Sequence, residues 1–124
     1  MKINIKATSI ELTPAIREFA EEKIGMLGRL LPAGSDELLV NVEIGRDTEH
    51  HRQGDVYRAE IRLLLNGKQL YAVENAADLY AAIDLVKDEM SRVIKTSAEK
   101  RNTLLRRGGR RVKEMLRRFN PWRN

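Results

Sequence analysis

The residues best suited to chemistry in this chain are the arginines and lysines near its C-terminal end. Residues 95–124 contain 11 basic and two acidic residues, a net charge of +9, whereas residues 1–94 contain 12 basic and 16 acidic residues, a net charge of −4. Arginine presents a planar fork of donors that matches phosphate oxygens, and neutralising several phosphates releases counterions. This asymmetry favours a polyanionic partner, either nucleic acid or an anionic membrane, over a charge run that serves only solubility.

A second polar group, Asp47-Thr48-Glu49-His50-His51, contains side chains of the kind that bind metals. Adjacent histidines in a polar loop do not converge on one ion without a preformed scaffold, and no third ligand lies at a useful spacing. We therefore expect a solvated loop with no metal site, and we expect no cofactor.

Carboxylates are the remaining candidates for catalysis. Six acidic residues lie on the predicted helices, off their apolar stripes: Glu18, Glu21, Glu22, Asp84, Asp88 and Glu89. An acid–base pair needs burial or close contact to separate its two pKa values, and exposed positions provide neither. The chain has no serine nucleophile elbow and no phosphate-binding glycine loop. We predict no catalytic residues and no small-molecule substrate; the protein is expected to bind a partner rather than act as an enzyme.

The composition indicates one ordinary folded domain. The chain has 124 residues, of which 42% are apolar, and this content excludes a disordered protein. It has no cysteine, so disulfides and cysteine-ligated zinc are impossible. No continuous apolar stretch resembles a signal peptide or a membrane span, so we expect a cytoplasmic protein without a membrane partner.

Hydrophobic periodicity predicts the order of the elements. Alternating apolar residues predict four strands, over residues 2–7, about 37–46, 57–65 and 70–74. Asn66-Gly67 is a type I′ turn signal and predicts a hairpin between the last two strands. Thr13 and Pro14 mark the start of a first helix, whose 3.6-residue period continues to about Leu27.

The second helix is expected to begin after Asp78 and to continue without interruption to residue 107. Gly108-Gly109 is expected to end it, and a short amphipathic helix can follow over residues 112–119. The order β-α-β-β-β-α predicts an α+β two-layer sandwich, with a four-stranded sheet, both helices on one face and a basic C-terminal extension. We expect a domain over residues 1–97, an Arg-rich tail over residues 98–124, and a first strand that pairs in parallel with a neighbour.

Two segments carry a resemblance to a known family. One is Ile3-Asn4-Ile5 with residues 11–19, Glu-Leu-Thr-Pro-Ala-Ile-Arg-Glu-Phe; the other is Leu70-Tyr71-Ala72-Val73-Glu74 with residues 78–84, Asp-Leu-Tyr-Ala-Ala-Ile-Asp. Over about residues 1–100 the chain resembles the ribosome hibernation-promoting factor family, also called ribosome-associated inhibitor A or the sigma-54 modulation protein family. The resemblance implies the same fold and binding to the small ribosomal subunit, in the channel used by mRNA and tRNA. The chain looks like a short member, because it ends before the second domain of the long members.

The resemblance also implies that basic residues on both helices bind rRNA. The residues that match, or add charge there, are Lys23, Lys87, Arg92 and Lys95. The chain departs from the family pattern at Glu89, where a lysine is common, and Asp88 lies beside it. From the tail we expect further rRNA contacts from Lys100, Arg101, Arg106, Arg107, Arg110 and Arg111. The alternatives are a general double-stranded RNA-binding protein and a protein bound to anionic membranes by its tail.

Overall fold

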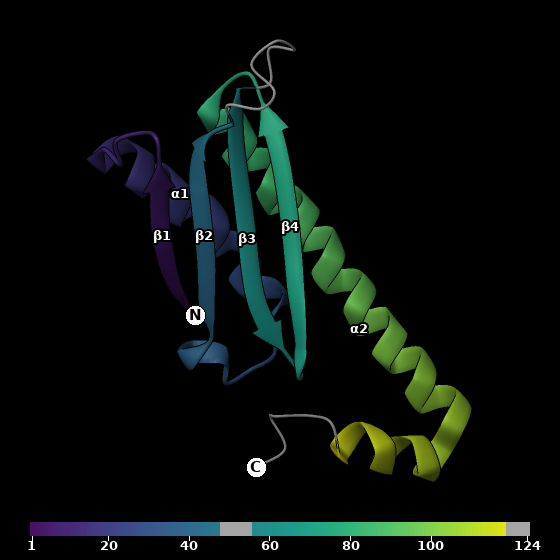
Figure 1. Ribbon diagram of the computed structural model, residues 1–124. Helices are drawn as coiled ribbons and strands as arrows, with labels where there is room; N and C mark the ends of the chain where they lie inside the picture. The colour runs from purple at the N-terminus through teal and green to yellow at the C-terminus, as the bar shows by residue number, and fades with distance from the viewer. Residues whose placement is uncertain (48–55, 119–124) are drawn as a thin grey trace.

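The computed structural model describes residues 1–47 and 56–118, and the elements follow the predicted order (Figure 1). They are β1 (Lys2–Thr8), α1 (Pro14–Gly25), the 3-10 turns η1 (Met26–Leu30) and η2 (Ser35–Glu37), β2 (Leu39–Arg46), β3 (Tyr57–Leu65), β4 (Lys68–Ala76) and α2 (Leu79–Arg118).

The four strands form one mixed sheet in the order β1-β2-β3-β4. β1 pairs in parallel with β2, as predicted, and the other two pairs are antiparallel. Figure 1 shows both helices behind the sheet, with α1 behind the β1–β2 side and α2 crossing diagonally behind β3 and β4. The predicted two-layer α+β sandwich is therefore confirmed.

The β3–β4 hairpin closes through the predicted turn. Asn66 and Gly67 have φ angles of 54° and 78°, the left-handed values that a type I′ turn requires. The hairpin pairs Leu65 with Lys68 and Tyr57 with Ala76, so β4 is longer than the predicted strand over residues 70–74. The predicted strand over residues 37–46 begins later, at Leu39, because Ser35–Glu37 form η2.

α1 begins at the position predicted from Thr13 and Pro14. The Thr13 hydroxyl accepts a hydrogen bond from the Ile16 N–H at 3.2 Å, and Pro14 occupies the first helical position. The α-helix ends at Gly25 and tightens into η1, whose Leu27 is buried in the core.

The core lies between the sheet and the helices. α2 contributes the apolar stripe predicted from the sequence. Four of its side chains have no exposed surface: Ala82, Ile83, Val86 and Met90. β2 and β3 contribute the inward half of each alternating pattern: Val40, Val42, Ile44, Ala59, Ile61, Leu63 and Leu65. The opposite face of the sheet carries mainly polar side chains.

The prediction that Gly108-Gly109 ends the second helix is wrong. α2 continues through both glycines to Arg118. A glycine costs a helix about 1 kcal/mol relative to alanine, and the arginine, leucine and lysine residues on both sides are strong helix formers that offset this cost. The predicted boundary between residues 97 and 98 thus falls inside α2, and Figure 1 shows the ribbon changing direction only in its last part. No helix in the described part of the chain is long and apolar enough to cross a membrane.

The parallel β1–β2 pair depends on the absence of a side chain at Gly45. A Cβ at this position would collide with the carbonyl oxygen of Thr8 on β1. We expect Gly45→Ala to lower the free energy of unfolding by about 1–3 kcal/mol, because backbone must shift to relieve the overlap. Urea unfolding followed by circular dichroism measures this change.

The matched control is Gly25→Ala, whose added methyl group meets no atom within 4 Å at the end of α1. It should leave stability unchanged or raise it by up to about 1 kcal/mol, since alanine favours helix. Equal stability of Gly45→Ala and the wild type would mean that this close approach does not constrain the sheet.

Candidate nucleic-acid interface

Two of the predicted rRNA-binding residues meet where α1 packs beside α2. The Lys23 ammonium of α1 lies 3.8 Å from the Asp84 carboxylate, and Lys87 of α2 lies 3.5 Å from the same carboxylate. Lys87 also donates a 2.5 Å hydrogen bond to Asp88. Both cations thus already have an anionic partner within the protein, and a phosphate must compete with Asp84 and Asp88 to bind them.

Aromatic packing holds the same junction. Phe19 of α1 and Tyr80 of α2 meet edge to face, with ring centroids 4.8 Å apart and planes at 84°. The Lys23 ammonium lies 5.7 Å from the centroid of the Phe19 ring. Tyr80 therefore serves in packing, which stabilises the contact that positions Lys23.

Arg92 is also paired inside the protein. Its guanidinium donates two hydrogen bonds to Glu89, one helical turn earlier, at 2.5 Å and 3.2 Å. A lysine at position 89 would have added a cation, whereas the glutamate neutralises one. Glu89 and Arg92 together thus add no net charge to this turn of α2.

The carboxylate–cation contacts shift the pKa values of their members. The hydrogen bond from Arg92 is the main cause that lowers the pKa of Glu89, and the same bond raises the pKa of Arg92. The hydrogen bond to Asp88 is the main cause that raises the pKa of Lys87. All three groups therefore keep their charges at neutral pH, and these pairs are not proton switches near pH 7.

Between Lys95 and Arg106, the cations of α2 have no such partners. Lys95, Lys100, Arg101 and Arg106 form no ion pair with any side chain in the described part of the protein, and the first two and Arg106 are exposed. Spacing at 100° per residue places Lys95 and Arg106 on the side of α2 opposite its buried stripe. Arg107, Arg110 and Arg111 lie on the same helix, but their side chains are outside the described part of the structure.

A groove of about 350 Å³ separates the start of β4 from the outer part of α2. Lys68 of β4 lines it together with Arg92 and Lys100 of α2, which lie eight residues apart and about 80° from each other around the helix axis. The structure thus places the predicted cations in three groups: Lys23 and Lys87 at the junction with α1, Arg92 and Lys100 on the flank along β4, and Lys95 and Arg106 on the outer side of α2. Sequence reasoning did not single out Lys68, because only the hairpin register brings it beside α2.

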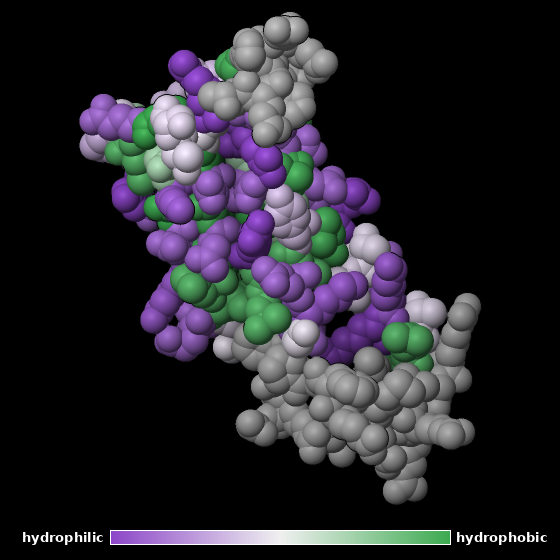
Figure 2. All heavy atoms as spheres, in the orientation of Figure 1, coloured by the Kyte–Doolittle hydropathy of each residue, from purple (hydrophilic) through white to green (hydrophobic). Residues whose placement is uncertain are grey.

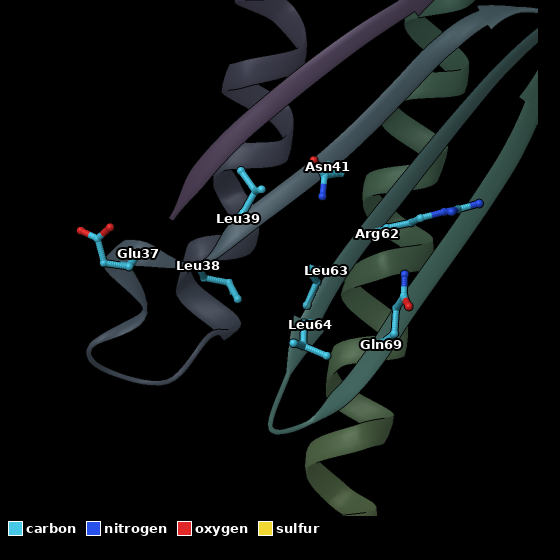
Figure 3. Close-up of a pocket in the computed structure, with 8 residues that line it drawn as sticks. All are labelled: Glu37, Leu38, Leu39, Asn41, Arg62, Leu63, Leu64 and Gln69. Carbon is cyan, nitrogen blue, oxygen red and sulfur yellow. The ribbon is translucent and has the colours of Figure 1, made fainter. Parts of the chain in front are cut away.

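The open face of the sheet carries polar side chains and one apolar group near the hairpin end. Figure 2 shows this face, where the apolar spheres gather over the ends of β2 and β3, and Leu39 and Leu64 are about half exposed. A hollow of about 500 Å³ lies there, with Glu37 and Arg62 at its two sides (Figure 3). Arg62 stacks over the Tyr71 ring at 4.9 Å and pairs with Glu60 at 3.7 Å. Nothing in this hollow forms a pair of carboxylates suited to acid–base chemistry.

The predicted polar loop contains one residue that the structure describes. Asp47 is buried rather than solvated, and it accepts a 2.8 Å hydrogen bond from the Asn75 side chain. His50 and His51 lie outside the described residues. Among the residues that are described, no three histidine, aspartate or glutamate side chains are grouped so that they could hold a metal ion.

Comparison with known proteins decides the family. The profile of the family described as "Sigma 54 modulation protein / S30EA ribosomal protein" matches residues 3–102, which include β1 to β4, α1 and the inner half of α2. The chain belongs to this family. This is the family that the two sequence segments resembled. The unpaired Lys95, Lys100 and Arg101 lie within the matched region.

Several relatives of this S30EA chain are named as ribosome hibernation promotion or promoting factors. It is 30% identical over 110 residues to the "Ribosome hibernation promotion factor" of Bacillus subtilis, covering 88% of this chain and 54% of that protein. It is 30% identical over 100 residues to the "Ribosome hibernation promoting factor" of Azotobacter vinelandii, covering 81% and 85%. The chain spans about half the length of the Bacillus relative and of a 28% identical cyanobacterial one.

Solved structures support the fold of the S30EA domain. The crystal structure of the Thermus thermophilus Protein Y N-terminal domain is 34% identical, with a TM-score of 0.60, and covers 77% of this chain and 98% of its own. A ribosomal subunit interface protein from Coxiella burnetii has a TM-score of 0.61 at 19% identity and supports the fold alone.

The Glu89–Arg92 pair can be tested by titration. Because Arg92 stabilises the ionised carboxylate, the Glu89 side chain should titrate below the usual range for glutamate in carbon-detected NMR. Arg92→Gln should move its midpoint upward. By linkage, the stabilisation from this pair is present above the unfolded-state pKa of Glu89 and is lost as the pH falls through the lowered folded-state pKa. An unchanged Glu89 midpoint in Arg92→Gln would show that the pair is not formed in solution.

Proposed function

We propose that this protein binds the small ribosomal subunit and holds it inactive for translation, as a ribosome hibernation factor. The observation that carries the proposal is the group of unpaired cations around the outer part of α2, Lys95, Lys100, Arg101 and Arg106, on a domain of the S30EA family. Such a group fits the phosphates of rRNA, since every cation that binds a phosphate releases condensed counterions. The names of its relatives support the ribosome as the partner.

In this proposal residues 1–97 form the ribosome-binding domain, and residues 98–124 extend its positive surface with Arg107, Arg110 and Arg111. The domain occupies the channel used by mRNA and tRNA, so that bound protein and initiating ligands exclude each other. The protein acts by occupying a site and needs no catalytic residue. Binding to ribosomes places it in the cytoplasm.

The cations with internal partners play a smaller part. Lys23, Lys87 and Arg92 each exchange a carboxylate for a phosphate when they bind, so each adds less than an unpaired cation does. Affinity accordingly comes mainly from the outer half of α2, and the α1–α2 junction contributes shape and orientation.

Co-sedimentation with separated subunits tests the proposal. Pelleting with small subunits alone, and loss of pelleting when mRNA and initiator tRNA already fill the channel, is the expected result. Equal pelleting with both subunits and with arbitrary duplex RNA would instead indicate a general RNA-binding protein. Retention on anionic vesicles in the presence of excess rRNA would indicate the membrane alternative.

The unpaired cations should control the salt dependence of binding. We expect Lys95→Gln combined with Arg106→Gln to reduce the slope of log affinity against log salt concentration by about 1.5, because two phosphate contacts at about 0.7–0.9 each are lost. The matched control is Lys2→Gln with Lys6→Gln, which removes the same charge from the open sheet face. Similar slopes for the two double variants would contradict the assignment to α2.

Glu89 should restrain binding. Glu89→Gln releases Arg92 from its internal partner, so we expect tighter binding to small subunits at low salt and a slope steeper by about 0.7–0.9. Glu11→Gln, an exposed acid that precedes α1, is the control for the change in net charge. An effect of the same size in both variants would mean that only net charge matters.

A further inference from the structure

The backbone groups along the free edge of β4 have no part in the proposed function, although Lys100 beside them does. β4 forms one edge of the sheet, and within the described residues no other element pairs with its outer side. It runs for nine residues without a proline, and its register with β3 is continuous, without a bulge. Proteins usually block such an edge with lysines, prolines or bulges, because its free backbone groups are a template for another strand.

The hairpin register determines which backbone groups face outward. In a two-residue hairpin the closing pair, here Leu65 and Lys68, is hydrogen-bonded, and hydrogen-bonded and non-hydrogen-bonded pairs then alternate. The N–H and C=O groups of Gln69, Tyr71, Val73 and Asn75 therefore point away from β3. They form a row of alternating donors and acceptors about 20 Å long.

The outer part of α2 provides a surface beside this row. α2 crosses behind the sheet and emerges past β4 at the hairpin end (Figure 1), so that the groove of about 350 Å³ lies between the edge and the helix. Its apolar part is formed by Leu70 and Val93, and Thr96 and Ser97 supply hydroxyl groups. A strand laid along β4 would rest its side chains on this helix.

The charges around the groove select the partner. Lys68, Arg92 and Lys100 line it, and no carboxylate does. Arg92 is already paired with Glu89, so the net positive charge comes from Lys68 and Lys100. The hollows on the open sheet face each include at least one glutamate among their lining residues. A strand that carries acidic side chains matches this surface, whereas a basic strand is repelled.

We propose that the β4 edge binds an extended, acidic polypeptide segment, which adds a fifth strand to the sheet. Backbone hydrogen bonds to Gln69, Tyr71 and Val73 hold the segment, and its acidic side chains pair with Lys68 and Lys100. RNA fits the groove less well, because its phosphodiester backbone has no N–H groups to donate to the edge carbonyls. The proposal does not depend on ribosome binding.

The test uses the whole protein and a synthetic seven-residue peptide of alternating valine and glutamate, blocked at both ends. Titration followed by proton–nitrogen NMR should shift the amide signals of Gln69, Tyr71 and Val73 and slow their exchange with solvent. The lysine counterpart of the peptide should bind at least about tenfold more weakly, a difference of about 1.4 kcal/mol. Lys68→Glu with Lys100→Glu should weaken the glutamate peptide by a similar factor, whereas Lys2→Glu with Lys6→Glu at the β1 edge should not.

Four outcomes would overturn the proposal. They are no saturable shift at millimolar peptide, shifts without slowed exchange of the β4 amides, tighter binding of a seven-residue oligouridylate to the same amides, and concentration-dependent shifts of these amides without peptide. The third would identify a phosphate site, and the fourth would identify a second copy of the chain as the occupant. Because no ribosome is present, failure here leaves the co-sedimentation result unaffected.

Discussion

The burial of one stripe of α2 against β3 and β4 is the contact on which the rest of this structure depends. Ile83, Val86 and Met90 have no exposed surface, and their spacing fixes the rotation of the helix about its axis. Once that rotation is set, every polar position of α2 has a fixed direction. Lys87 must turn toward α1, Arg92 toward β4, and Lys95 toward solvent. Core packing thus determines which cations lie close to one another in the unbound protein.

Local sequence signals were sufficient for most of the fold. Thr13 and Pro14 fixed the start of α1, Asn66-Gly67 fixed the hairpin, and alternation placed the inward residues of β2 and β3 correctly. The helix end predicted at Gly108-Gly109 was wrong, because the helix propensity of the neighbouring residues outweighs the cost of two glycines. A prediction from the glycine pair alone does not include that contribution. The strand over residues 70–74 was too short for a related reason, since pairing with β3 extends it.

The candidate interface was harder to predict, because a sequence gives the number of charged residues but does not show which of them form ion pairs. Lys23 and Asp84 are 61 positions apart, and only the packing of α1 on α2 makes them partners. Asp47, assigned to a solvated loop, is buried beside Asn75 of β4. The pairing of Lys23 with a carboxylate of the inner half of α2 therefore depends on tertiary packing. The lack of internal partners at Lys95, Lys100, Arg101 and Arg106 follows more directly from the sequence, because few acids lie near them.

The continuity of α2 has a thermodynamic consequence. A single ladder of backbone hydrogen bonds joins the buried turns around Met90 to the cationic turns around Arg106, so helix formation in one half favours it in the other. A polyanion that binds the outer half in its helical form therefore stabilises the folded domain, by about 2.7 kcal/mol at a concentration one hundred times its dissociation constant. In a cell, the population of molecules engaged with such a ligand would be the one that best resists heat and proteolysis.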